Sequence, residues 1–311
     1  MNRTKKIETV ALIGLGAMGC SYLGKISETI PMEKIQAIAS GARAERYRKN
    51  GIILNGRRID FPIAEPNEAR FADLLIFTVK FNQLKEAIEE ARGAVGPDTI
   101  VISLLNGITS EGLIADAYGE KHVLYSLALG IDATRSGDET NVTVYGVIPF
   151  GAARNEPGHY DGRVTALKEF WDRVGLNSEI PEDMHRALWQ KFMMNVGVNQ
   201  TAAVLEAPYG VLQRGREARA LVVSAMEEVV ALAAYEDIHL GRADIDRALT
   251  VLDTLSPNGK CSMLQDVEAK RQTEVAIFGG TVALLGKKHG VPTPVNDMLV
   301  RIIRAKEETF E

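Results

Sequence analysis

The sequence predicts an α/β protein in two parts: a doubly wound sheet domain over residues 1–180 and an all-helical domain over residues 181–311. Three observations support this division. Short apolar runs of the kind that buried parallel strands show recur through the first part. A glycine-rich turn follows the first of these runs. From residue 183 onward, apolar residues instead repeat at intervals of three and four, which is typical of helices.

The first apolar run, Val10 to Ile13, leads into a G-x-G-x-x-G motif. Its first glycine permits a tight turn, its second lets a pyrophosphate approach the backbone, and its third lets the next helix pack close to the strand. That helix presents N–H groups and its positive dipole end to the phosphates. The motif alone is weak, but its place between a strand and a helix predicts a dinucleotide site. The site comprises Gly14, Leu15, Gly16, Ala17, Met18 and Gly19.

The end of the second predicted strand, Ile35 to Ala39, indicates which dinucleotide binds. Sites for NAD usually place an Asp or Glu there, which bonds the ribose 2′-hydroxyl. This chain has Ser40 and Arg43 instead, with Arg46 as a further cation. These residues suit a 2′-phosphate, so the sequence favours NADPH as the cofactor. The alternative is that the two arginines belong to a solvated helix face.

Two further predicted strands end in polar residues. The run 72–79 is followed by Lys80, and the run 99–105 is followed by Asn106. Open α/β sheets bind their ligands beyond the carboxyl ends of the strands, so both side chains are candidates. The alternatives are a solvated helix start for Lys80 and a plain turn for Asn106. Later strands are expected over residues 123–127, 141–150 and 175–180, before a helix start at Pro181.

An apolar helical segment, LWQKFMMNVGVNQ at 188–200, carries three polar residues in one stripe. Lys191, Asn195 and Asn199 follow one another at steps of four, and each step moves about 40° around a helix. An ammonium and two amides buried without partners would be destabilising, so a face that binds a polar ligand explains them. The alternative is a solvated helix edge with a long lysine and two surface amides.

A second polar cluster lies at 260–274, KCSMLQDVEAKRQTE. Ser262 and Glu274 are candidate site residues, and Asp266 falls close to the helical phase of both. An ordinary charged helix is the alternative.

The remaining segments of the second part are expected to be structural. Residues 220–236 form a long apolar helix. GTVALLGKK at 280–288 resembles a phosphate loop, but the wrong glycine spacing and the lysine at its end exclude that motif. This segment is expected to form a helix that ends before Gly290, and PTP at 292–294 is expected to turn the chain into the last helix.

Composition narrows the function classes. A net charge of −5 gives no general attraction to nucleic acid or anionic lipid, and no apolar run reaches membrane-spanning length. Two cysteines in 311 residues make no disulfide framework, so a cytoplasmic location is expected. The basic and apolar residues 1–20 could form a secretory signal, but a first strand is favoured. The histidines and cysteines show no metal-site spacing.

Taken together, these motifs resemble the ketopantoate reductase (2-dehydropantoate 2-reductase) family over essentially the full length. The order and spacing of the set are far more specific than any single motif. The set is GLGAMG at 14–19, TVK at 78–80, NG at 106–107, LWQKFMMNVGVN at 188–199, SMLQD at 262–266, RQTE at 271–274 and GVPTP at 290–294.

The resemblance implies a Rossmann domain followed by an all-helical domain, with an active site in the cleft between them, and a possible homodimer. It implies NADPH-dependent reduction of a 2-keto acid, a step of pantothenate and coenzyme A biosynthesis, with Lys191 as the general acid. Asn195, Asn199 and Ser262 would bind the substrate. The remaining matches are Lys80 on the cofactor side, Asn106 near both cofactor and substrate, and Glu274 at the active centre, beside the cofactor.

The implied chemistry agrees with these residue types. Hydride addition to a ketone develops alkoxide charge, which an ammonium can stabilise and protonate. Glu274 would either hold Lys191 charged or bind a substrate hydroxyl. Two alternatives remain open: a reductase of another small 2-keto acid, since pocket contacts decide specificity, and a non-catalytic module that senses NADPH. A sensor has no need of a proton donor, which favours an enzyme.

Overall fold

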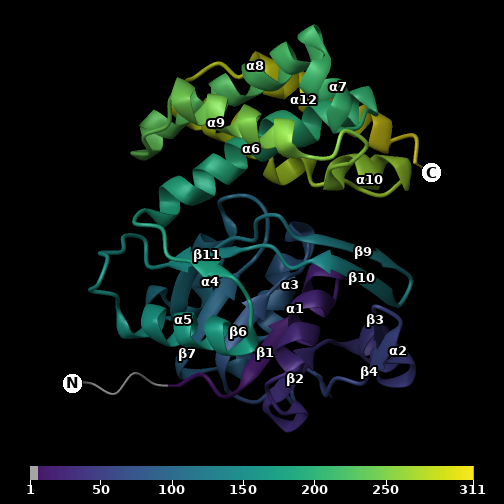
Figure 1. Ribbon diagram of the computed structural model, residues 1–311, viewed down its shortest axis with the longest axis vertical. Coiled ribbons are helices and arrows are strands. Elements are labelled where there is room, and N and C mark those ends of the chain that lie inside the picture. The colour runs from purple at the N-terminus through teal and green to yellow at the C-terminus, as the bar shows by residue number, and fades with distance from the viewer. Residues whose placement is uncertain (1–5, 311) are drawn as a thin grey trace. The chain divides into compact units, whose positions relative to one another are not determined.

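The computed structural model describes residues 6–310, and the contacts within the chain divide it into two compact units, Met1–Met184 and His185–Glu311 (Figure 1). The sequence placed the division between residues 180 and 181. Residues 181–184 group with the first unit because backbone and side-chain bonds tie them to it. Asn155 donates from Nδ2 to the Pro181 carbonyl (2.7 Å), and the Met184 amide donates to the Ala153 carbonyl (3.1 Å).

The first unit is built on an eight-stranded sheet in the order β12-β11-β8-β7-β6-β1-β2-β5. Its five central strands, from β8 to β2, run parallel, and β11 runs antiparallel to β8. The strands are β1 (Val10–Ile13), β2 (Ile35–Ile38), β5 (Ile63–Ala64), β6 (Ala72–Phe77), β7 (Val95–Ser103), β8 (Val123–Ser126), β11 (Ile148–Gly151) and β12 (Ser178–Glu179).

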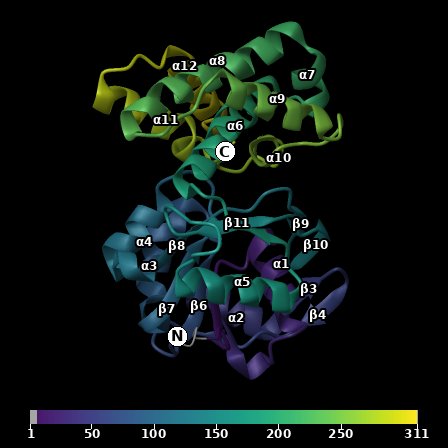
Figure 2. The same ribbon diagram turned by 60° about the vertical axis from the view of Figure 1, so that its left-hand side comes forward.

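Helices cover both faces of this sheet, which explains why its central strands are apolar on both sides (Figure 2). Along β1, Val10 and Leu12 pack on one face, whereas Ala11 and Ile13 pack on the other. The helices of the first face are α1 (Ala17–Ser27), α2 (Gly41–Asn50) and α5 (Gly162–Val174), and those of the second are α3 (Leu84–Glu90) and α4 (Ser110–Tyr118). This arrangement confirms the predicted α/β class.

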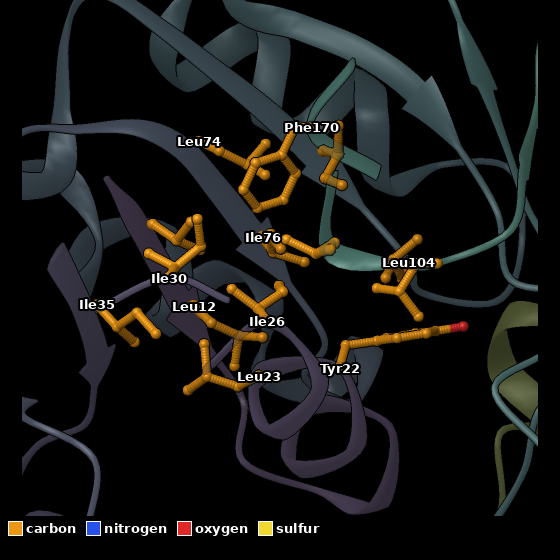
Figure 3. Close-up of a cluster of buried hydrophobic side chains, with 14 of the residues drawn as sticks. Leu12, Tyr22, Leu23, Ile26, Ile30, Ile35, Leu74, Ile76, Leu104 and Phe170 are labelled. Carbon is orange, nitrogen blue, oxygen red and sulfur yellow. The ribbon is translucent and has the colours of Figure 1, made fainter. Parts of the chain in front are cut away.

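The core between α1, α5 and the sheet is made of large aliphatic and aromatic side chains. Figure 3 shows Leu12 of β1 and Leu74 and Ile76 of β6 among Leu23 and Ile26 of α1. All five are fully buried. The basic segment weighed as a secretory signal falls mostly on residues 1–5, which lie outside the described residues, but β1 itself is part of this core.

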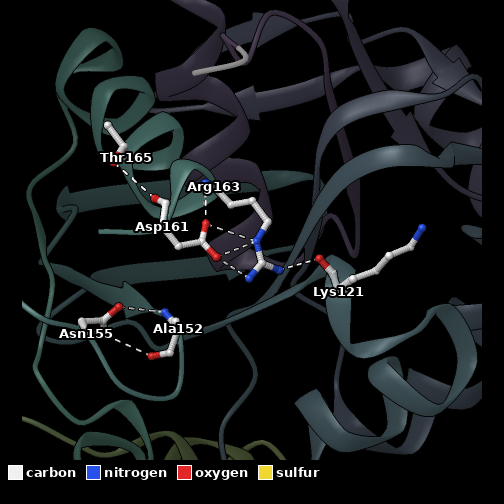
Figure 4. A network of polar contacts seen from close by, with 6 residues as sticks. All are labelled: Lys121, Ala152, Asn155, Asp161, Arg163 and Thr165. Carbon is white, nitrogen blue, oxygen red and sulfur yellow. Dashed lines mark hydrogen bonds and ion pairs between the residues drawn. The ribbon is translucent and has the colours of Figure 1, made fainter. Parts of the chain in front are cut away.

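The start of α5 shows how a loop is fixed to the sheet unit (Figure 4). Asp161 is the N-cap of α5 and accepts the Arg163 amide hydrogen (2.6 Å). The Arg163 guanidinium also pairs with Asp161 and donates to the Lys121 carbonyl. Nearby, Asn155 bonds Ala152 through both backbone groups (3.0 Å each). These bonds hold the segment that leads toward the second unit.

A second, four-stranded sheet, in the order β4-β3-β10-β9, was not predicted from the sequence. Its strands are β3 (Ile52–Leu54), β4 (Arg57–Ile59), β9 (Asp132–Ser136) and β10 (Glu139–Val144). The expectation of one strand over 141–150 was wrong, because β10 and β11 belong to different sheets. The chain turns between them at Gly146 (φ +70°), where a Cβ would lie 2.0 Å from the Leu129 carbonyl oxygen.

The second unit is helical, and both predicted boundaries near its end are confirmed. Segment 280–288 lies in a helix that stops at the left-handed Gly290, and the last helix begins at Pro294. Its helices are α6 (Met184–Leu205), α7 (Tyr209–Arg214), α8 (Arg216–Ala233), α9 (Arg242–Thr254), α10 (Ser262–Glu268), α11 (Gly279–His289) and α12 (Pro294–Glu307). None of the helices described is long and apolar enough to cross a membrane.

Short 3₁₀ turns connect several of these elements. They are η1 (Met32–Lys34), η2 (Phe81–Gln83), η3 (Arg92–Ala94), η4 (Glu120–His122), η5 (Ala234–Glu236) and η6 (Val275–Ile277). The start of α6 at Met184, rather than at Pro181 as expected, follows from the backbone bonds that hold residues 181–184 against the loop at 153–155.

Glu228 of α8 caps the N-terminus of α12. Its carboxylate accepts the amide hydrogens of Val295 (2.8 Å) and Asn296 (3.0 Å) and the Asn296 side-chain amide (2.7 Å). The N-cap residue Thr293 makes no capping bond of its own, so Glu228 satisfies amide hydrogens that the first helical turn leaves open. The negative charge also meets the positive end of the α12 dipole.

We therefore expect Glu228→Ala to lower the free energy of unfolding by about 2 kcal/mol, because the partly buried backbone amides of Val295 and Asn296 lose their acceptor. The matched control is Glu227→Ala, since Glu227 is 56% exposed and its nearest described cation, Arg242, lies 3.7 Å away; its cost should stay below about 0.5 kcal/mol. Urea unfolding followed by circular dichroism measures both. Equal losses in the two variants would contradict the capping role.

Candidate functional site

The register of the central strands brings three loops to one edge of the sheet. Ile13 pairs with both Ile38 and Phe77, and Phe77 pairs with Ser103. The glycine loop after β1, the segment after β2 and the segment after β6 therefore leave the sheet side by side. The strand order reverses at β1, which is where such folds bind dinucleotides.

The three glycines of the loop have different steric surroundings. Gly14 has a φ of +106°, and a Cβ on it would lie 2.6 Å from the Val79 nitrogen. A Cβ on Gly19 would lie 2.1 Å from the Gly14 carbonyl oxygen. Gly16 has nothing within 4 Å of the corresponding position, and it is the residue that precedes α1. The loop thus has one open side, next to the N-terminus of α1, where a phosphate can approach.

A cavity of about 300 Å³ opens on that side. The predicted residues Gly14, Leu15, Gly16, Arg43 and Lys80 line it. Ser40 lies beside it, next to the lining residue Ala39. Ala17, Met18 and Gly19 form the first turn of α1. The cavity also includes residues that the sequence did not single out, or named only as a spare cation: Arg46, Tyr47, Gln83, Glu90 and Arg135.

Two of the arginines that line this cavity lie close to the ring of one tyrosine, which also lines it. The guanidinium of Arg46 lies 5.1 Å from the ring centre of Tyr47, and that of Arg135 lies 5.8 Å from it. Arg135 comes from β9 of the second sheet and donates to the Leu15 carbonyl inside the glycine loop. Sequence patterns could not find Arg135, because β9 is 120 residues away from Leu15 along the chain.

A carboxylate lies beside the segment that follows β2, although the sequence of that segment places no acid at the strand end. Glu90, the last residue of α3, accepts a hydrogen bond from the Ser40 hydroxyl and lies 3.5 Å from Nη2 of Arg43. Its side chain is only 11% exposed. Ser40 and Arg43 were predicted to receive a 2′-phosphate because no acid follows β2 in the sequence. In the folded chain a carboxylate from another element lies against both of them.

Lys80 and Asn106 follow two neighbouring strands, and each comes the same number of residues after its strand ends. Lys80 stands three residues after Phe77 of β6, and Asn106 stands three residues after Ser103 of β7, the partner of Phe77. Lys80 is the residue before η2 and lines the cavity, while Asn106 lies in the loop between β7 and α4. Both therefore leave the sheet at its carboxyl edge.

In the second unit, the polar stripe on α6 joins the start of α10. Nδ2 of Asn199 donates to Oδ1 of Asn195 (3.2 Å), and the Ser262 hydroxyl donates to Oδ1 of Asn199 (3.2 Å). Lys191 lies one turn before Asn195 on the same face and is half-buried. The structure thus brings three of the predicted residues into one hydrogen-bonded row, with a lysine one helical turn beyond it.

The predicted helical phase between Asp266 and Glu274 was wrong. Helix α10 ends at Glu268, and Lys270 then adopts a positive φ of 48°, which turns the chain away. Asp266 stays on α10 and pairs with Arg271 (2.9 Å), whereas Glu274 stands at the N-cap of η6. Glu274 therefore belongs to a different segment from Ser262.

The thiol next to Ser262 offers no nucleophile. Burial raises the pKa of Cys261 to about 11, so its sulfur stays protonated at neutral pH. Within residues 6–310, no group of three His, Cys, Asp or Glu side chains is placed to hold a metal ion. The chemistry available to this face is hydrogen bonding by amides and a hydroxyl, together with the ammonium of Lys191.

Comparison with known proteins gives matches along nearly the whole chain. Residues 10–170 match the family model described as ketopantoate reductase PanE/ApbA, and residues 183–307 match the model of its C-terminal part. The 2-dehydropantoate 2-reductases of Streptococcus pyogenes serotype M3 and Pyrococcus horikoshii are each 26% identical to the chain. Each alignment covers 96% of this chain and 97% of the relative.

Solved structures share the fold. A PanE/ApbA family ketopantoate reductase from Ralstonia eutropha JMP134 has a TM-score of 0.84 at 23% identity, over 97% of this chain and 99% of that one. D-mandelate dehydrogenase, solved with NADH and anilino(oxo)acetate, has a TM-score of 0.84 at 24% identity over the same shares. A dimeric ketopantoate reductase from Staphylococcus aureus has a TM-score of 0.77 at 19% identity, over 97% and 100%.

The glycine loop gives a prediction that separates binding from folding. Gly16→Ala should leave the melting temperature unchanged, because nothing in the folded chain meets the added methyl. It should weaken the binding of a nicotinamide dinucleotide at least about tenfold, because the methyl would block the approach of the phosphates. Gly19→Ala should instead lower stability by about 2 kcal/mol or more, because its methyl overlaps the Gly14 carbonyl. Calorimetric titration and thermal unfolding test the pair. Unchanged dinucleotide affinity in Gly16→Ala would show that the loop does not bind the phosphates.

Proposed function

The chain belongs to the ketopantoate reductase family, and we propose that it reduces 2-dehydropantoate to pantoate with NADPH, a step of pantothenate and coenzyme A biosynthesis. The observation that carries this proposal is the row of Asn195, Asn199 and Ser262, with Lys191 one turn away on α6. It offers amide and hydroxyl groups for the hydroxyl and carboxylate of a keto acid, and one ammonium for its carbonyl oxygen. We further propose a cytoplasmic homodimer.

The residues of the first unit suit the cofactor. The open side of Gly16 and the N-terminus of α1 accommodate a pyrophosphate. Arg43 and Arg46, with Ser40, supply cations and a hydroxyl for a 2′-phosphate at the end of β2. Lys80 adds a cation at the end of β6. A reduced nicotinamide supplies the hydride when it is bound, so the protein needs no nucleophile of its own.

The second unit supplies the proton and the orientation. As the carbonyl carbon of the keto acid gains a hydride, its oxygen gains negative charge, which the Lys191 ammonium stabilises and neutralises by giving up a proton. Asn195, Asn199 and Ser262 fix the substrate through donor and acceptor edges. Asn106, in the loop after β7, is a further proposed contact of cofactor and substrate. Glu274 either keeps Lys191 charged or binds a substrate hydroxyl.

A second candidate function is reduction of another small 2-keto acid, which the structural likeness to D-mandelate dehydrogenase favours. A non-catalytic NADPH sensor is the third. The deciding assay is NADPH oxidation with 2-dehydropantoate beside pyruvate, 2-ketoisovalerate, oxaloacetate and benzoylformate, repeated with NADH. We expect 2-dehydropantoate to give the highest kcat/KM. A higher kcat/KM for another acid would make that acid the substrate. Binding of NADPH without turnover of any acid would favour the sensor.

The general acid gives the sharpest mutational prediction. Lys191→Ala should lower kcat by about a hundredfold to ten-thousandfold, because the developing alkoxide loses its proton donor. NADPH affinity should change less than about threefold, because the residues proposed to bind the cofactor phosphates lie in the first unit. A matched control is Lys85→Ala, an exposed lysine on α3. An unaltered kcat in Lys191→Ala would exclude this lysine as the acid.

A further inference from the structure

Glu90 stands out among the residues that line the cofactor cavity. It is a carboxylate at the C-terminal end of α3, where the helix dipole disfavours negative charge. Its side chain is 11% exposed, so most of its hydration is lost. Both features are destabilising unless neighbouring groups compensate for them. The compensating groups belong to the segment that follows β2.

The neighbours of Glu90 are two of the residues proposed to bind the 2′-phosphate. The Ser40 hydroxyl donates to Oε1 of Glu90, and Nη2 of Arg43 lies 3.5 Å from the same oxygen. Ser40 is the N-cap of α2, yet its side chain makes no capping bond. The hydroxyl is directed to Glu90 instead of to the start of its own helix.

This arrangement treats the two dinucleotides differently. The 2′-phosphate of NADPH carries nearly two negative charges, so Glu90 repels it and also competes with it for Ser40 and Arg43. The ribose 2′-hydroxyl of NADH is neutral and can donate a hydrogen bond to a carboxylate. The rest of the two cofactors is identical. Glu90 therefore acts on the one group in which they differ.

We propose that Glu90 is a specificity-determining residue that narrows the preference for NADPH over NADH. Its carboxylate repels the 2′-phosphate of NADPH and accepts a hydrogen bond from the 2′-hydroxyl of NADH. This inference rests on the proposed use of a nicotinamide dinucleotide. It assigns the balance between the two cofactors to a residue on α3, fifty positions after the serine that it contacts.

The chain offers a matched control one turn earlier on the same helix. Oε1 of Glu86 also lies 3.5 Å from Nη2 of Arg43, but the Glu86 side chain is 64% exposed and is not part of the cavity lining. Water and salt screen an exposed charge far more than a buried one. Substitution of either glutamate by glutamine removes the same charge at the same distance from Arg43. A difference in cofactor binding between the two variants is therefore due to the burial of Glu90 and its place in the cavity lining.

The experiment is calorimetric titration of the full chain with NADPH and with NADH at one fixed ionic strength. Glu90→Gln should raise the ratio of the Kd for NADH to the Kd for NADPH about tenfold, because a negative charge near the phosphate is lost in a poorly screened place. Glu86→Gln should change that ratio less than about twofold. Glu90→Asp keeps the charge and should keep the ratio within about threefold of the wild type.

The outcomes separate this inference from the proposed function. If the wild type binds both dinucleotides and Glu90→Gln leaves the ratio unchanged, or changes it no more than Glu86→Gln does, the inference is wrong and the proposed function stands. If Glu90→Asp behaves as Glu90→Gln does, charge is not the cause and the inference is also wrong. If the wild type binds neither dinucleotide, both the inference and the proposed function fail.

Discussion

The contact between Gly19 of α1 and the carbonyl of Gly14 fixes the geometry on which the cofactor side depends. Only a residue without a side chain fits there, since a Cβ would lie 2.1 Å from that oxygen. The Thr78 hydroxyl, at the end of β6, donates to the same carbonyl (2.8 Å). The strand, the turn and the helix are thereby joined to the next strand of the sheet. Gly16 is left with an open side at the start of α1, and the cavity forms around it.

The parts of the fold that sequence could predict are those encoded locally. Four-residue runs such as Val10–Ile13 are apolar throughout because both faces of the sheet are covered. The end of α11 at Gly290 also depends on a single residue type in a single conformation. The second sheet lacks such signals. Its strands are three to six residues long and partly exposed, and β3 finds its partner β10 far along the chain.

The same distinction applies to the candidate site. The stripe of Lys191, Asn195 and Asn199 is visible in sequence because helical neighbours recur at fixed spacing. The bond from Ser262 to Asn199 joins positions 63 residues apart and needs the packing of two helices. Glu90 was missed for a similar reason. The residues that follow β2 favour NADPH, but Glu90 of α3 lies against them, and no local sequence pattern indicates that neighbour.

The charged residues around the cavity therefore fall into two groups: those that cannot discriminate between NADPH and NADH, and those that can. Arg135 donates to the Leu15 carbonyl within the glycine loop, and its Nη2 lies 3.7 Å from Asp138, beyond hydrogen-bonding distance. We infer that a guanidinium at that place would attract a pyrophosphate, which NADH and NADPH share, and would raise the affinity for both without selecting between them. Selection requires a difference in free energy at the 2′ position alone. Arg43 and Glu90 lie 3.5 Å apart with opposite charges, and under the proposal above the balance between them, rather than the number of arginines, sets the cofactor preference.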